Sequence, residues 1–205
     1  MKTVLQNFNF GYKNIFIYVP DILEIQSLHQ QQLIDNENAP FPYWAKVWPS
    51  AIALCEFLEK NNHLIKNKNI VELAAGLGLP SIVAAEYGKH IFCSDYLETP
   101  LQFVQKSISN LELTNVSYGI LNWNHLPENM VADVLLLSDI NYEPHEFDAL
   151  YTMMHRFIFS NTIIILATPQ RLVAKDFIEK ILPWCKSKET IEIENKMISI
   201  LVLSI

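Results

Sequence analysis

The sequence predicts an α/β fold built on a doubly wound, mostly parallel sheet of seven strands. From Ile70 onward, short apolar runs alternate with segments long enough to form crossover helices. Most of these runs lack polar alternation, which is typical of strands covered on both faces. The last two runs, ETIEIE and MISILVLS, are separated only by Asn195-Lys196. This spacing predicts an antiparallel hairpin at the C-terminal end of the sheet.

The central strands and helices alternate along the chain. Strands are expected at NIVEL (69–73), HIFCS (90–94), NVSYGI (115–120), ADVLLLS (132–138) and TIIILA (162–167). Helices are expected at 79–88, 97–111, 145–159 and 171–182. Strand, helix and strand in series imply parallel pairing with right-handed crossovers.

The N-terminal part of the chain departs from this pattern. Residues 3–19 have the pattern of a second β-hairpin, turning around Gly11. Asp21 is the expected cap of a helix over about 22–32, and a second helix is expected from about Pro49 to Lys60. No repeat, low-complexity tract or Pro/Gly linker divides the chain. We therefore expect one domain over 1–205, with residues 1–40 as an N-terminal extension packed on it.

Composition excludes several classes of function. The 205 residues carry a net charge of −7 with no dense basic cluster, whereas nucleic-acid binders need a basic face, so nucleic acid is not an expected partner. No apolar run approaches the ~20 residues of a membrane span, and the N-terminus lacks a secretory signal pattern. The three cysteines and six histidines are scattered without metal-ligand spacing. We expect no metal, no membrane and a cytoplasmic protein with reduced thiols.

The most informative stretch is the small-residue turn in IVELAAGLGLP (70–80). Small residues such as Gly76 and Gly78 let the backbone turn tightly and approach a ligand closely. The free N–H groups of a helix opened by Pro80 favour an anionic group. Glycines that serve only the geometry of the turn are the simpler interpretation. Asp95 favours a ligand site, because a carboxylate at the end of the next strand can accept both ribose hydroxyls of an adenosine.

Two adenosine cofactors are compatible with this turn. The run from Gly76 to Ser81 nearly matches the GxGxxG sequence of dinucleotide-binding folds. However, Ser81 replaces the third glycine, and the carboxylate of Glu72 lies close to where a pyrophosphate would have to sit. The amino group of S-adenosylmethionine (SAM) tolerates a carboxylate better than a phosphate does. The turn therefore favours SAM, with a dinucleotide as the alternative.

Four motifs occur in a recognisable order, namely PYWAKVWP (42–49), VELAAGLGLPS (71–81), LNWN (121–124) and SDINY (138–142). In this order they resemble the class I, seven-β-strand methyltransferases grouped as family 16. That group includes protein-lysine methyltransferases and is also labelled nicotinamide N-methyltransferase-like. The resemblance covers residues 40–170 and implies a Rossmann-like sheet.

The resemblance implies a role for residues in each motif. Trp48, with Trp44 nearby, would lie beside the methionine part of SAM, and Ser138 would belong to the same cofactor site. The first cofactor loop would comprise Glu72, Ala74, Gly76 and Gly78, Asp95 would hold the ribose, and Tyr96, Asn122 and Trp123 would flank the adenine. Asp139 and Tyr142 match an Asp-x-x-Tyr motif near the acceptor and are the implied catalytic pair. The chain departs from the family at Ala74, which replaces the first glycine, and at Asn122, which replaces an aspartate.

Each of these residues also has a structural interpretation. Asp139 fits a turn or helix cap before Glu143-Pro144. Tyr142 fits a buried tyrosine with a satisfied hydroxyl, and the tryptophans fit ordinary packing. Asp139 nevertheless follows a central strand at the carboxyl edge of the sheet, where ligands bind in open α/β folds.

We therefore expect a SAM-dependent N-methyltransferase that releases S-adenosyl-L-homocysteine (SAH) and methylates a protein lysine. The resemblance alone supports the lysine. The alternatives are a small-molecule amine methyltransferase, a SAM-binding module without catalysis and, more remotely, an NAD-dependent oxidoreductase. A monomer is expected.

Overall fold

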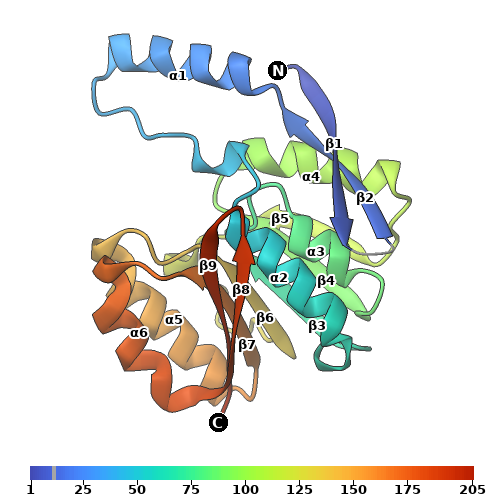
Figure 1. Cartoon of the computed structure of the whole chain (residues 1–205), viewed down its shortest axis with the longest axis vertical. Helices are drawn as coiled ribbons and strands as arrows, with labels where there is room; N and C mark the ends of the chain where they lie inside the picture. The colour runs from blue at the N-terminus through green and yellow to red at the C-terminus, as the bar shows by residue number, and fades with distance from the viewer. Residues whose placement is uncertain (11–12) are drawn as a thin grey trace.

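The computed structural model describes residues 1–10 and 13–205. Seven strands form one sheet in the order β5-β4-β3-β6-β7-β9-β8 (Figure 1). They are β3 (Asn69–Leu73), β4 (His90–Asp95), β5 (Val116–Ile120), β6 (Val134–Ser138), β7 (Ile163–Pro169), β8 (Cys185–Ile193) and β9 (Lys196–Leu203). The first five pair in parallel, and β9 runs antiparallel to both β7 and β8. The predicted sheet and its C-terminal hairpin are confirmed.

Helices cover both faces of this sheet, which explains why its strands are apolar throughout. One face packs against α2 (Pro49–Lys60), α3 (Leu79–Ala84) and α4 (Glu98–Asn110), and the other against α5 (Phe147–Phe159) and α6 (Lys175–Ile181). Residues 134–137 of β6 are completely buried between the two layers. Among the described residues, no helix is long and apolar enough to cross a membrane.

The strand order reverses at the centre of the sheet. From β3 the chain proceeds outward to β4 and β5, then returns to β6 on the other side of β3 and continues to β7. The loops that leave the carboxyl ends of β3 and β6 therefore diverge. In open α/β sheets, a crevice for ligands forms at this point.

Some element boundaries differ from the prediction. The C-terminal hairpin turns at Glu194-Asn195, with Ile193 paired to Lys196, one residue earlier than the expected Asn195-Lys196. Both turn residues have positive φ, 51° and 60°, as a two-residue turn that matches the strand twist requires. The last long helix is also shorter than 171–182, because residues 172–174 form a 3-10 turn and α6 begins at Lys175.

The N-terminal extension is a hairpin followed by a helix. Strands β1 (Thr3–Phe10) and β2 (Lys13–Pro20) pair antiparallel, as predicted, while Gly11 lies outside the described residues. Asp21 caps α1 (Ile22–Asp35), because its Oδ1 accepts hydrogen bonds from the Leu23 and Glu24 amides at 3.0 and 3.3 Å. The buried residue of α1 is Ile25, and Figure 1 shows this helix at one end of the molecule, set apart from the sheet and the helices that cover it.

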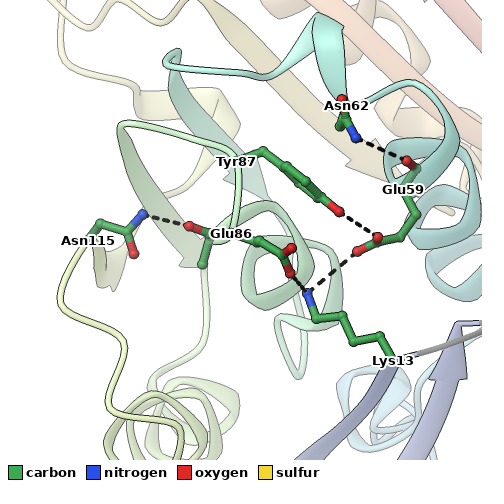
Figure 2. A network of polar contacts seen from close by, with 7 residues as sticks. Lys13, Glu59, Asn62, Glu86, Tyr87 and Asn115 are labelled. Atoms are coloured by element: carbon green, nitrogen blue, oxygen red, sulfur yellow. Dashed lines mark hydrogen bonds and ion pairs between the residues drawn. The ribbon is translucent and has the colours of Figure 1, made fainter.

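A polar network ties the hairpin to the core helices (Figure 2). The Lys13 ammonium pairs with the carboxylate of Glu86 and lies 3.6 Å from Oε1 of Glu59. The Tyr87 hydroxyl donates to Oε2 of Glu59 at 2.7 Å. The Glu59 side chain is only 10% exposed. Its negative charge is therefore stabilised mainly by these partners, whereas the charge of a surface carboxylate is stabilised by water.

We predict that Lys13→Met lowers the free energy of unfolding by about 1 kcal/mol, since it leaves Glu59 beside Glu86 without the cation that both contact. Urea denaturation of the two proteins measures the difference. Adding Glu59→Gln should recover most of the loss, because the remaining repulsion is removed. If the double variant is as unstable as Lys13→Met, packing of the lysine stem rather than its charge holds the hairpin.

Candidate active site

A cavity of about 620 Å³ lies at the carboxyl ends of β3, β4 and β6, which is within the usual range for small-molecule sites. Most of the predicted site residues line it, namely Trp48, Ala74, Gly76, Gly78, Asp95, Tyr96, Trp123, Ser138, Asp139 and Tyr142. Trp44 lines it as well. Four motifs that are up to a hundred residues apart in sequence therefore meet at one cavity.

The turn after β3 forms one wall of this cavity through an unusual backbone. Ala74, Gly76 and Gly78 all have left-handed φ values of 53°, 53° and 70°, which cost a residue with a Cβ roughly 1–2 kcal/mol. Gly78 is also required by space, since a Cβ there would lie 2.9 Å from the Cys93 Sγ atom. The backbone of the turn thus lines the cavity. Ala74 is its strained residue, because it adopts a left-handed conformation although it carries a Cβ.

Asp95 is held rigidly at the end of β4. Its Oδ2 accepts a hydrogen bond from the Gly76 amide at 2.9 Å, and its Oδ1 accepts one from the Leu97 amide at 3.0 Å. Burial raises the pKa of Asp95, while these backbone hydrogen bonds oppose the shift. Each oxygen keeps a lone pair for a further donor, so the carboxylate fits the two hydroxyls of a ribose.

Glu72 lies elsewhere than the sequence suggested. It is completely buried and does not line the cavity, and its Oε2 accepts hydrogen bonds from the Ser81 amide at 2.9 Å and the Ser81 hydroxyl at 2.5 Å. Burial raises the pKa of Glu72 to about 8, against the hydrogen bonds from Ser81. In this structure Glu72 supports the first turn of α3.

Asn122 also lies apart from the main cavity. Its Oδ1 accepts from the Asn124 amide at 2.9 Å and caps a short 3-10 turn. Asn122 lines an adjoining cavity of about 220 Å³. Trp123 and Tyr96 line both cavities, and the Trp123 indole donates to Oε2 of Glu146 at 2.9 Å.

Aromatic side chains also line the cavity. The ring of Tyr43 lies 5.2 Å from that of Tyr142 and 6.1 Å from that of Trp48, between centroids. The Trp48 indole donates to the carbonyl of Tyr43 at 2.7 Å, which fixes its orientation. Burial raises the pKa of Tyr142 to about 12, with help from the nearby charge of Glu143. Tyr142 is therefore a protonated phenol at neutral pH.

Asp139 contacts a residue that sequence reasoning missed. Its Oδ1 lies 2.5 Å from Nη2 of Arg171, and its Oδ2 accepts a hydrogen bond from the Ser50 hydroxyl at 3.3 Å. Asp139 itself has a left-handed φ of 56°. Arg171 follows the apolar run at 162–167, so its position after a predicted strand was the signal that could have placed it at the carboxyl edge of the sheet.

The sequence also did not predict three other residues that line the cavity, namely Tyr43 and, from α1, Ile25 and Leu28.

Comparison of the sequence with known protein families identifies the family to which this cavity belongs. Residues 28–184 match the family described as lysine methyltransferase. The chain belongs to the lysine methyltransferase family. The predicted family, Rossmann-like fold and SAM cofactor are confirmed, in preference to the dinucleotide alternative.

Individual relatives differ in the residue that they modify. The chain is 32% identical over 120 residues to human histone-arginine methyltransferase METTL23, covering 54% of this chain and 63% of that protein. It is 33% identical over 141 residues to Xenopus tropicalis protein N-lysine methyltransferase METTL21A, covering 66% and 65%. The chain thus spans less than two thirds of the length of either relative.

Solved structures agree with the fold. A precorrin-6y C5,15-methyltransferase from Geobacter metallireducens superposes with a TM-score of 0.60 at 12% identity, covering 76% of this chain and 87% of that chain. TrmK of M. capricolum, solved with SAH, superposes with a TM-score of 0.54 at 12% identity, covering 72% and 67%. At this identity they support the architecture alone.

We predict that Ala74→Gly stabilises the protein by about 1 kcal/mol, because glycine adopts the left-handed backbone of this turn without the clash of a Cβ. Thermal or urea denaturation measures the change. A matched control is Ala75→Gly in the same turn, where φ is not positive and the substitution should destabilise. A loss of stability in Ala74→Gly would contradict the assignment of strain.

We also predict a pH dependence of stability that originates at Glu72. Its pKa rises from 4.5 to about 8 on folding, so between these pH values the unfolded chain releases a proton that the folded chain keeps. This contribution to stability is complete below pH 4.5 and is lost as the pH rises through about 8. Denaturation of Glu72→Gln, which keeps the Ser81 contact, should show a flatter dependence over this window. Parallel curves for the two proteins would contradict the prediction.

Proposed function

We propose that this chain is a SAM-dependent N-methyltransferase that acts on a protein lysine side chain. The observation that supports it is the meeting of the cofactor turn and the Asp139-Tyr142 motif at a single cavity. One cavity can then hold the methyl donor and admit an acceptor, which is the requirement for direct transfer.

In this proposal the cofactor lies along the turn after β3. Asp95 accepts the ribose hydroxyls, Trp48 lies beside the methionine part, and the backbone at Gly76, Gly78 and Ser138 lines the path between them. Tyr96, Trp123 and Asn122 flank the adenine, which places the adjoining cavity of about 220 Å³ at that end. Glu72 acts indirectly, by holding the helix that follows the turn.

The bound cofactor supplies a methyl group already activated by its sulfonium charge. The acceptor must arrive as a neutral amine, although the reference pKa of lysine is about 10.4. The nitrogen lone pair of the acceptor would take up the methyl carbon as the carbon–sulfur bond broke, and sulfur would keep the electrons of that bond. The product ammonium releases a proton to solvent, and SAH remains. The aromatic faces of Tyr43, Trp48 and Tyr142 suit an alkyl chain that ends in a cationic or neutral nitrogen.

Several broader assignments accompany this proposal. A single domain over 1–205 fits the family match, because the matched residues 28–184 include the helices on both faces of the sheet. The buried, unpaired thiols of Cys55 and Cys93 suit a reducing compartment, and so support a cytoplasmic location. We further propose a monomer and no nucleic-acid acceptor, given the net charge of −7.

Calorimetric titration tests the cofactor. We expect SAM and SAH to bind in the micromolar range and NADH not to bind. Asp95→Asn should weaken both SAM and SAH by about tenfold or more, because the amide loses the charged acceptor for the ribose. Binding of NADH alone would contradict the proposal.

A further inference from the structure

The acceptor end of the cavity contains an ion pair that the chain supplies from two different loops. Asp139 follows β6, and Arg171 follows β7. The Asp139 amide donates to the Ala167 carbonyl at 2.9 Å, and the Arg171 amide donates to the Pro169 carbonyl at 2.9 Å. The Thr168 hydroxyl donates to Oδ1 of Asn141 at 2.7 Å, which links the loop after β6 to the end of β7. The backbone thus holds the two charged side chains opposite each other.

Both partners of the pair are largely removed from water. The Asp139 side chain is 12% exposed and that of Arg171 is 30% exposed. Oδ2 of Asp139 accepts from Ser50, which is completely buried in the first turn of α2. Asp139 therefore faces a guanidinium on one side and the positive end of a helix on the other. Asp139 lines the cavity, but its negative charge is balanced by Arg171 within the protein.

The other charged side chains of the cavity do not make its lining acidic. Among the described residues, the charged side chains that line it are Lys46, Asp95, Asp139 and Arg171. Lys46 Nζ lies 5.4 Å from the ring of Trp48, and Asp95 is engaged at the end of β4. Glu143, His145 and Glu146 line the adjoining cavity, and the phenols that face the cavity are Tyr43, Tyr96 and Tyr142.

We infer that Arg171 determines which acceptor the site takes: by neutralising Asp139, it admits a primary amine in its uncharged form and excludes a guanidinium. This inference rests on the proposed methyltransferase function and adds a specificity-determining residue to it. Arg171 touches Asp139 rather than the transferred methyl, so it acts as a positioning and charge-setting residue.

Two physical reasons support this assignment. A substrate guanidinium keeps its charge at all physiological pH values and needs a free carboxylate as its partner. The carboxylate at this position is already paired, and the guanidinium of Arg171 occupies the place that a substrate guanidinium would need. Pairing with Arg171 also removes an unpaired carboxylate that would otherwise stabilise the charged form of an incoming lysine. Loss of the proton, which transfer requires, therefore becomes easier.

The first test needs no acceptor. SAM carries a sulfonium charge that SAH lacks, so the ratio of their affinities reports the charge of the site. Calorimetry should show that Arg171→Gln, which leaves Asp139 unpaired, shifts this ratio toward SAM by roughly three- to tenfold. Arg171→Lys should keep the wild-type ratio. Asp139→Asn should shift the ratio toward SAH, and the Asp139→Asn/Arg171→Gln double variant should return it to the wild-type value.

The second test uses defined peptides. Two degenerate peptide pools, one with a fixed central lysine and one with a fixed central arginine, are incubated with SAM carrying a tritiated methyl group. We expect wild-type transfer to the lysine pool alone. Arg171→Gln should require a higher pH to reach half of its maximal rate on that pool, whereas Arg171→Lys should restore the wild-type pH profile.

The outcomes separate the inference from the function on which it rests. If SAM and SAH both bind but Arg171→Gln weakens them equally, Arg171 is only structural and the inference is wrong. Transfer to the arginine pool by the wild-type protein would also overturn it. If the wild-type protein binds neither SAM nor SAH, the proposed function itself fails. If it binds both but modifies neither pool, the lysine assignment fails while the affinity ratio still decides the role of Arg171.

Discussion

The reversal of strand order between β3 and β6 is the constraint on which the rest of this molecule depends. Because the helices that follow these two strands pack on opposite faces of the sheet, their loops must separate, and the carboxyl ends of the strands lie uncovered between them. Hydrophobic burial on both faces fixes this geometry. The cofactor turn and the Asp139 loop are then brought together by the sheet itself and need few direct contacts with each other.

The sequence predicted most of this framework and part of the site. Apolar runs without alternation correctly placed the central strands, since burial on both faces leaves that signature in any chain. Turn positions were harder: the C-terminal hairpin bends at Glu194-Asn195, because register with β9 decides the turn and that information is not local. Arg171 was missed for a similar reason. Its partner Asp139 is 32 positions away, and only the packing of β6 beside β7 brings them together.

The motif alone did not predict the direction of the Glu72 side chain. A carboxylate at the end of a strand before a glycine turn suggests contact with the cofactor, yet Oε2 of Glu72 accepts both of its hydrogen bonds from Ser81 in the interior. The same residue type in the same position can either bind a ligand or support the helix that does so. Only the direction of the side chain distinguishes the two. One strand away, Asp95 has both oxygens anchored by backbone amides and lines the cavity.

The sparse packing of α1 makes one wall of the cavity tolerant to substitution. The helix contributes Ile25, Leu28 and Gln32 to the outer wall of the cavity, but it buries only Ile25. Substitutions along the rest of its surface therefore carry little thermodynamic penalty for the body of the protein. The outer wall of the cavity can therefore change its shape and polarity without disturbing the sheet or the glycine turn that form the opposite, deeply packed part of the molecule.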